Sequence, residues 1–287
     1  MTVDQLALEV TALDAWTEPH VFEVTAARIA DYALATNDPI EAHLSGVVAS
    51  PVFAVVPAFD ALIGPALKLL PSALLPRCVH GEQDFRFHRP IRPGDVLTSR
   101  GKVVGYAGRP SGTRFVVLIE TRDAAGELVA EQHATSFVRG FDCGDSVGES
   151  APDHRFPEEI RKYAPVAVAP AHVDDDQTFR YSKASGDPVT IHLDEAAARA
   201  AGLPGIIAHG LCVQAMTAAG LLRAVAGDDV SRLRRLAVRF AKPVLPGQDL
   251  TTTIWYAGSE AGIDRFVFEV TADGVVVLSD GLAEVSA

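Results

Sequence analysis

Asp187 and His192 lie five positions apart in an otherwise apolar stretch, Ser185–Cys212. His209 and Gly210 follow them near the end of the same stretch. A carboxylate and an imidazole that share one water molecule can take a proton from it and return a proton to a substrate. The backbone N–H of a glycine at the start of a helix can stabilise an oxygen that gains negative charge. These residue types predict acid/base chemistry beside a carbonyl group.

Regular secondary structure would keep Asp187 and His192 apart. Five positions at about 100° each leave two helical residues on different faces, and an odd separation in a strand puts them on opposite faces. Gly186 and Pro188 predict a bend in the chain at this point. A helix is expected to follow over Asp194–Ala201, so the pair should occupy a loop at a helix start.

A longer helix is expected directly after Gly210. The segment Leu211–Ala226 is apolar on nearly every side, which is typical of a buried helix, and Gly227 suits its C-terminal cap. The backbone N–H of Gly210 would then lie unpaired at the positive end of this helix. A glycine at that point permits the close approach of a ligand.

Simpler interpretations of these residues stay open. An aspartate and a histidine at this spacing are often a turn residue and a surface residue, and His209 alone fits a core histidine with satisfied hydrogen bonds. A metal site formed by His192, Asp194 and His209 is disfavoured because their spacing resembles no known ligand set, so no metal is expected. The chain also has no glycine-rich phosphate loop and no G-x-S-x-G motif.

The chain repeats itself at an offset of 149 residues. The segments DYALATNDPIEAHL and RYSKASGDPVTIHL match at this offset, so Asp38 and His43 are the counterparts of Asp187 and His192. Three further matches follow in the same order in both halves: Arg86–Asp95 with Arg239–Asp249, Gly105–Gly108 with Trp255–Gly258, and Arg114–Glu120 with Arg265–Val270. Two halves of one architecture are the simplest account.

Each half contains a polar loop with a short helix, then a long apolar helix, then segments that alternate apolar and polar residues. Alternation at period two predicts strands. A helix followed by antiparallel strands, twice, is an α+β pattern in which a sheet wraps around a central helix. The predicted boundaries are an N-terminal repeat over 1–142, a linker rich in Gly, Pro and Ser over 143–172, and a C-terminal repeat over 173–287.

The composition of the 287 residues narrows the possible partners. A net charge of −12 argues against nucleic acid, which requires a basic face. Cys78, Cys143 and Cys212 fit no metal spacing and are expected to be reduced thiols in a cytoplasmic protein. The N-terminus does not resemble a signal peptide. The most apolar region, Val48–Leu70, is interrupted by prolines and charges, so it is expected in the core and not in a membrane.

The run YSKASGDPVTIHLDEAAARAAGLPGIIAHGLC resembles the signature of the MaoC-like, (R)-specific enoyl-CoA hydratases, also called hydratase 2. The later run RFAKPVLPGQDLTTTIW is similar to the same family. In the first half, VHGEQDFRFHRPIRPGD and HATSFVRG resemble the degenerate first repeat of that family. The resemblance covers nearly the whole chain. It implies a double hotdog fold, in which two antiparallel sheets each wrap around a long central helix.

The resemblance also implies a reaction that needs no cofactor: reversible addition of water to a trans-2-enoyl-CoA, giving a (3R)-3-hydroxyacyl-CoA. Carried over by position, Asp187 and His192 bind and activate the water, and the Gly210 N–H is the donor to the thioester oxygen. Protonation at C2 passes through enolate-like charge on that oxygen, so a fixed donor there lowers the barrier. Thr190 and His209 are expected to contact the acyl-CoA substrate, and the expected assembly is a homodimer.

The chain departs from the family motif between the aspartate and the histidine. The family has Asn-Pro where this chain has Val189 and Thr190. The side chain of valine cannot form a hydrogen bond, and one hypothesis is that the Thr190 hydroxyl partly substitutes. In the first half, Asp38 and His43 are not followed by a His-Gly pair. That half is therefore expected to have no second active site, and the resemblance implies that it accommodates the acyl chain.

Five basic residues lie close together in Ser231–Lys242, a local exception in an acidic chain: Arg232, Arg234, Arg235, Arg239 and Lys242. Such a cluster could receive the phosphates of CoA. A solvated basic face of a strand is the alternative, because runs of surface charge are common.

Two other functions are compatible with these residues. An acyl-CoA thioesterase of the hotdog class would direct the water onto the thioester carbon. A non-catalytic acyl-CoA-binding partner subunit would keep the fold and lose the chemistry. Val189 favours the binding subunit, whereas Asp187, His192 and Gly210 favour the hydratase.

Overall fold

The computed structural model describes residues 6–287, which form two compact units. Unit 1 comprises the described part of Met1–Phe22 together with Pro57–Phe85 and Val96–Asp153. Unit 2 comprises Glu23–Val56, Arg86–Asp95 and His154–Ala287.

Unit 1 is built on an antiparallel sheet in the order β1-β3-β4-β5-β2, and β6 pairs with β3. Helix α3 packs on β3 and β4. A Cβ added at Gly101 would lie 2.0 Å from the Ala61 carbonyl oxygen, so glycine lets the helix backbone approach the sheet closely. The elements of this unit are η2 (Val10–Ala12), β1 (His20–Glu23), α3 (Phe59–Leu69), η4 (Ser72–Arg77), β2 (Cys78–Phe87), β3 (Val96–Arg109), β4 (Gly112–Arg122), β5 (Leu128–Arg139) and β6 (Ser146–Gly148).

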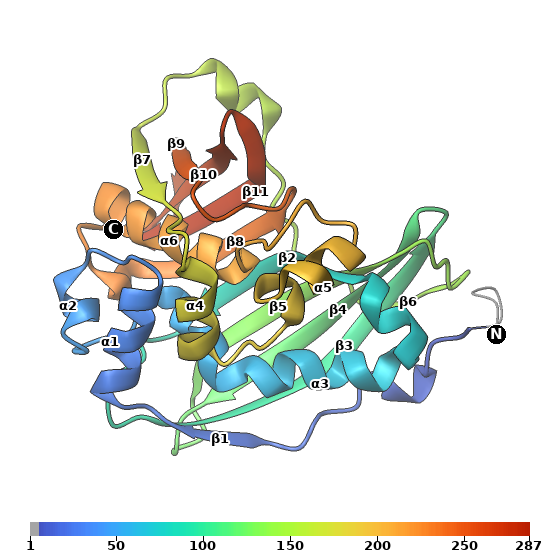
Figure 1. Ribbon diagram of the computed structural model, residues 1–287. Helices are drawn as coiled ribbons and strands as arrows, with labels where there is room; N and C mark the ends of the chain where they lie inside the picture. The colour runs from blue at the N-terminus through green and yellow to red at the C-terminus, as the bar shows by residue number, and fades with distance from the viewer. Residues whose placement is uncertain (1–5) are drawn as a thin grey trace. The chain divides into compact units, whose positions relative to one another are not determined.

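Unit 2 has an antiparallel sheet in the order β7-β9-β10-β11-β8, and helix α6 packs against β7, β8 and β9 (Figure 1). Its helical elements are α1 (Ala26–Ala35), α2 (Glu41–Leu44), η3 (Pro51–Ala58), η5 (Glu158–Lys162), α4 (Gln177–Ser185), η6 (Thr190–His192), α5 (Glu195–Ala200), α6 (Gly210–Leu221), a π-helical turn η7 (Leu222–Ala226) and η8 (Val230–Arg232). Its strands are β7 (Ala167–His172), β8 (Leu233–Phe240), β9 (Asp249–Glu260), β10 (Ile263–Ala272) and β11 (Val275–Ser286).

The strands of each unit follow one order when β1 to β5 are matched with β7, β8, β9, β10 and β11 along the chain. The 149-residue repeat in the sequence is therefore also a repeat of topology. The predicted α+β class with antiparallel strands is confirmed. The predicted repeat boundaries stay a prediction, because the compact units group segments by contact: Glu23–Val56, from the first repeat, belongs to unit 2.

The segment that the sequence indicates as a linker, 143–172, carries more structure than expected. It contains β6, η5 and β7, and β7 pairs with β9. Phe156 packs edge-to-face on Trp255 with ring centroids 5.4 Å apart, and the Trp255 indole N–H donates to the Tyr163 carbonyl at 3.1 Å. The sequence VAVAPAH did not indicate strand β7, because alanine and proline have low β-strand propensity.

The apolar region around Val48–Leu70 forms η3 and α3. Its helical stretch Pro51–Leu69 is long and apolar enough to cross a membrane by length and composition, and 56% of its most apolar window is buried. The predicted buried helix after Gly210 is confirmed: α6 has buried residues along its whole length, and Gly227 ends the following turn in the left-handed conformation. The three cysteines are free, as expected.

Candidate active site

The bend that carries Asp187 begins where α4 ends. Gly186 caps the helix with φ +83°, a left-handed conformation that glycine adopts without steric cost. The Ser182 hydroxyl donates to the Asp187 carbonyl at 2.5 Å, and the Asp187 N–H donates to Ser185 Oγ at 3.2 Å. Asp187 is therefore held through its own backbone, as the bend at Gly186 and Pro188 predicts.

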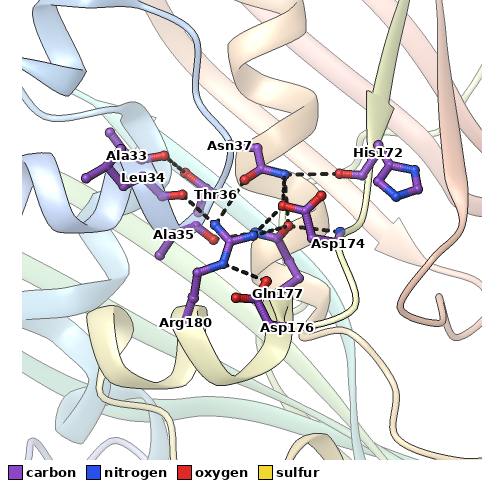
Figure 2. A network of polar contacts seen from close by, with 10 residues as sticks. All are labelled: Ala33, Leu34, Ala35, Thr36, Asn37, His172, Asp174, Asp176, Gln177 and Arg180. Carbon is purple, nitrogen blue, oxygen red and sulfur yellow. Dashed lines mark hydrogen bonds and ion pairs between the residues drawn. The ribbon is translucent and has the colours of Figure 1, made fainter.

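Helix α4 is itself anchored on α1 by a polar network at the C-terminal end of α1 (Figure 2). The guanidinium of Arg180 donates to the Leu34 carbonyl at 2.9 Å, and the Gln177 amide donates to the Ala35 carbonyl. These donors satisfy carbonyls that a helix end leaves unpaired. Asn37 Nδ2 donates to Asp174 Oδ2 at 3.0 Å and, together with Arg180, lowers the pKa of that carboxyl. The sequence analysis missed this network, because its partners lie some 140 residues apart.

The Asp187 carboxylate is directed by the backbone. Its Oδ1 accepts the Val189 N–H at 3.0 Å, and its Oδ2 makes no hydrogen bond within the described residues. Burial raises the pKa of Asp187, although the Val189 N–H and the nearby His192 oppose the shift. The side chain is only 16% exposed. One carboxylate oxygen thus stays free to hold a water molecule.

His192 lies at the end of η6, with its ring fixed by one hydrogen bond. Nδ1 donates to the Ile207 carbonyl at 2.9 Å, which leaves Nε2 as an acceptor in the neutral ring. Burial lowers the pKa of His192, so the ring is neutral at neutral pH. A neutral imidazole with a free acceptor nitrogen suits proton abstraction from water.

His209 lies between two aromatic rings. Its ring stacks on the His192 ring, with ring centroids 3.9 Å apart. Its ring also contacts the Tyr181 ring in a tilted arrangement, with ring centroids 4.9 Å apart. Its Nε2 lies 3.9 Å from Asp187 Oδ2. Within the described chain neither ring nitrogen of His209 has a hydrogen-bond partner of good geometry, which does not fit a core histidine with satisfied hydrogen bonds. Burial and the neighbouring His192 lower the pKa of His209 to about 2, against an opposing effect of the Asp187 backbone.

Gly210 is the first residue of α6, with His209 as the N-cap. The N–H groups of Cys212 and Val213 donate to the His209 carbonyl, whereas the Gly210 N–H has no acceptor among residues 6–287. The predicted unpaired donor at a helix start is therefore present. A Cβ at this position would lie 2.9 Å from a ring carbon of Phe240, which explains why the residue is glycine.

Asp187, His192 and His209 together form a compact polar group. One ligand atom from each residue lies within 4.8 Å of the other two. A carboxylate and two neutral imidazoles at this separation could hold a divalent metal ion or a single water molecule. The sequence analysis considered Asp194 in place of Asp187 for a metal. Asp194 instead caps α5 by accepting the Ala197 N–H at 2.7 Å.

The two residues that depart from the family motif lie at the surface. Val189 is 41% exposed. The Thr190 side chain is also exposed and makes no hydrogen bond within the described part of the chain, while its carbonyl accepts from Leu193 and Asp194. The hydroxyl of Thr190 is thus not bonded to Asp187 or His192.

The structure does not bring the five basic residues together. Arg232 donates to the Ser286 carbonyl at 2.8 Å, and Arg235 is buried with its guanidinium 3.9 Å from Glu284. Arg234 is exposed near the start of β8. Arg239 and Lys242 lie next to Phe240 in the sequence or two residues after it, and the Phe240 ring borders Gly210. Leu233 and Arg239, six strand positions apart in β8, are separated by about 20 Å at about 3.3 Å per strand residue, so Arg232 and Arg239 do not form one cluster.

The first-repeat counterparts, Asp38 and His43, form a closed pair. Their side chains are 1% and 0% exposed, and His43 Nδ1 and Asp38 Oδ2 are 2.7 Å apart in a direct hydrogen bond. Asp187 and His192 make no such bond to each other. The two groups therefore bond to each other directly and not through a shared water, and a single active site in the second repeat stays a prediction.

Gln214 is a polar residue that the sequence analysis missed. It lies one turn after Gly210 on α6, is fully buried, and has no hydrogen-bond partner for its amide N or O in the described chain. An apolar helix pattern gave no reason to single it out.

Replacing Gln214 with leucine is expected to raise the free energy of unfolding by about 1–3 kcal/mol, because an unpaired buried amide carries its full desolvation penalty. Denaturant unfolding of both proteins measures this. A less stable leucine variant would mean that the amide has a partner. Met216→Leu, a buried apolar exchange two residues further along α6, is the matched control and should change stability by less than about 1.5 kcal/mol.

Comparisons with known proteins point to one family. Residues 155–276 match the family described as MaoC like domain, and residues 13–132 match the FAS1-like dehydratase domain region. The chain is 31% identical to 3-hydroxyacyl-thioester dehydratase Y of Mycobacterium tuberculosis, over 97% of this chain and 99% of that protein. It is 27% identical to a probable enoyl-CoA hydratase 2 of Dictyostelium discoideum, over 71% of this chain and 69% of that protein.

Solved structures of the same architecture exist. A MaoC-like dehydratase from Phytophthora capsici superposes with a TM-score of 0.82 at 23% identity, covering 100% of this chain and 99% of the other. A Mycobacterium tuberculosis protein described as having a double hotdog fold gives a TM-score of 0.58 at 14% identity, over 94% and 96% of the two chains. These likenesses establish a hotdog fold of the MaoC-like type.

Proposed function

Because the chain belongs to the MaoC-like hydratase 2 family and is an enzyme of the hydratase/dehydratase class, we propose that Asp187 and His192 activate water for reversible hydration of a trans-2-enoyl-CoA. The product would be a (3R)-3-hydroxyacyl-CoA. The observation that carries the proposal is the free Oδ2 of Asp187 beside the neutral His192, next to a helix start with an unpaired N–H.

The chemistry follows from these contacts. The water donates its protons toward Asp187 Oδ2 and His192 Nε2, and its oxygen bonds to C3 of the enoyl group. The π electrons of the C2–C3 bond move toward the thioester, whose oxygen gains negative charge. The Gly210 N–H, aided by the positive end of α6, stabilises that charge. The pair then returns a proton to C2, and the thioester bond stays intact.

The backbone orients the Asp187 carboxylate whichever side chain stands at position 189. Val189 has no polar side chain, but its N–H donates to Asp187 Oδ1 and orients the carboxylate. The same bond occurs in the first repeat, where the Ile40 N–H donates to Asp38 Oδ1 at 2.9 Å. The bend, and not the residue at position 189, therefore sets the direction of the carboxylate.

The remaining expectations from the family resemblance, on the fold of each repeat, CoA binding and assembly, are part of this proposal. Each repeat would be a hotdog whose sheet wraps its own long helix, with the first repeat accommodating the acyl chain. Arg239 and Lys242, which lie close to Phe240 in the sequence, would receive the CoA phosphates. A cytoplasmic homodimer stays a prediction.

Crotonyl-CoA and a longer trans-2-enoyl-CoA test the proposed reaction. The enoyl thioester absorbance should fall while a thiol reagent detects no free CoA. Thiol release in step with the absorbance change would establish a thioesterase instead. Acyl-CoA binding without either change would establish a binding subunit.

The pH dependence of kcat/KM should show loss on the acid side only. The reaction needs Asp187 ionised and His192 neutral. Burial raises the pKa of Asp187 and lowers that of His192, so activity is lost as pH falls through the raised carboxyl pKa, above 3.8, and the two groups titrate as a pair. From neutral to mildly alkaline pH the rate should stay level. A fall in kcat/KM above neutral pH would contradict a neutral His192 as the working form.

A further inference from the structure

His209 is a buried residue beside Asp187 and His192 that takes no part in the proton transfers proposed above. Its ring is 2% exposed, and both ring nitrogens lack a hydrogen-bond partner in the described chain. A buried polar group left unpaired costs about 1–3 kcal/mol, so an imidazole in this state needs a specific reason. Its surroundings give one, because Nε2 faces the carboxylate of Asp187.

The separation between His209 and Asp187 fits a bridge. Nε2 lies 3.9 Å from Asp187 Oδ2, which is too long for a direct hydrogen bond. One water molecule at about 2.8 Å from each atom spans this distance at an angle near 90°. One ring nitrogen of His192 lies within 4.8 Å of the ligand atoms of Asp187 and His209, so a water between those two also lies beside the His192 ring.

The water has four hydrogen-bonding directions, two through its protons and two through its lone pairs. Asp187 Oδ2 and His192 Nε2 are both acceptors, because Nδ1 of His192 already donates to Ile207. They engage both protons. One lone pair must point at C3 of the substrate for attack. The remaining lone pair requires a donor, and an N–H on Nε2 of His209 faces the same point.

We propose that His209 donates its Nε2–H to the oxygen of the attacking water and so aims the other lone pair at C3, an inference that rests on the proposed function. His209 transfers no proton: it donates the same hydrogen bond before and after the C3–O bond forms. In dehydration it donates to the departing hydroxyl. The ring stays neutral, in keeping with its strongly lowered pKa, and this fixed donor is the third contact of the water.

Two substitutions separate this role from simple packing. His209→Gln keeps a donor near the position of Nε2 and loses the ring. His209→Phe keeps a ring between Tyr181 and His192 and loses the donor. The hydrogen bond predicts that the glutamine variant retains kcat to within about tenfold and that the phenylalanine variant loses about 100-fold, since positioned proton contacts contribute about 10²–10⁴-fold. KM for crotonyl-CoA should change little in either.

A role in ring stacking alone predicts the opposite order, with phenylalanine more active than glutamine. That order, or wild-type kcat in the phenylalanine variant, would overturn the proposal. Thermal unfolding of each variant confirms the fold, and His209→Leu replaces the phenylalanine variant if the larger ring does not fit. Asp187→Asn is measured in parallel. An active Asp187→Asn enzyme would remove the proposed function itself, whereas an inactive one beside an active His209→Phe would remove only the role of His209.

Discussion

Replacing Asp187 with asparagine is expected to lower kcat for crotonyl-CoA hydration by about 10³–10⁴-fold, because the variant loses the group that shares the proton of the water. The fold should persist. The asparagine carbonyl oxygen can still accept the Val189 N–H, and the Ser182 hydroxyl still holds the backbone of residue 187. KM should change by a small factor, since the carboxylate acts on water and not on CoA. Stopped-flow or extended steady-state absorbance measures this range.

The first repeat offers a matched control for this substitution. Asp38→Asn makes the same chemical change at the equivalent position, where the carboxylate bonds directly to His43 and is buried. Weakening this buried hydrogen bond should cost about 1–3 kcal/mol of stability. The fraction that folds should keep the kcat of the wild type. Loss of kcat in folded Asp38→Asn, or retention of kcat in Asp187→Asn, would contradict the assignment of the reaction to the second repeat.

Replacing Gly210 with proline is expected to lower kcat by about 10²–10³-fold relative to Gly210→Ala, because proline removes one backbone donor from the developing oxyanion. Proline is well tolerated at the first position of a helix. His209 before it already has φ −61° and ψ +131°, the extended conformation that a following proline requires. The substitution therefore deletes the N–H with little change to the course of the backbone.

Gly210→Ala is the necessary reference, because both substitutions add a Cβ that would lie 2.9 Å from the Phe240 ring. The steric effect of the added Cβ is present in both variants and cancels in the ratio of their kcat values. Equal kcat values for the two variants would show that the Gly210 N–H contributes nothing to the reaction. Unfolding curves establish that each variant reaches the same fold.

The sequence predicted the bend at Asp187, the helix start at Gly210 and the repeat, because each depends on local residue types. Gly186 provides the left-handed cap of α4. The apolar residues after Gly210 have the composition of a buried helix, and they form α6. The matching strand orders follow from the repeated pattern of strands.

Other features depend on contacts between distant segments and could not be predicted in this way. The network of Asn37 with Asp174, Gln177 and Arg180 joins segments some 140 residues apart. The ring nitrogens of His209 have no hydrogen-bond partner because the rings of Tyr181 and His192 pack around it. The spacing of residues in the sequence does not indicate this packing. Strand β7 forms because β9 offers it a pairing edge, although its sequence favours a linker.

The central claim is that water adds to C3 of an enoyl thioester, and labelled water tests it most directly. The wild-type enzyme is incubated with crotonyl-CoA in ¹⁸O-enriched water. The products are separated, and their masses are measured by mass spectrometry. The account predicts one ¹⁸O in the 3-hydroxyl group of an intact (3R)-3-hydroxyacyl-CoA, with no label in a free acid. Label in the carboxylate of released crotonic acid, with free CoA, would contradict it.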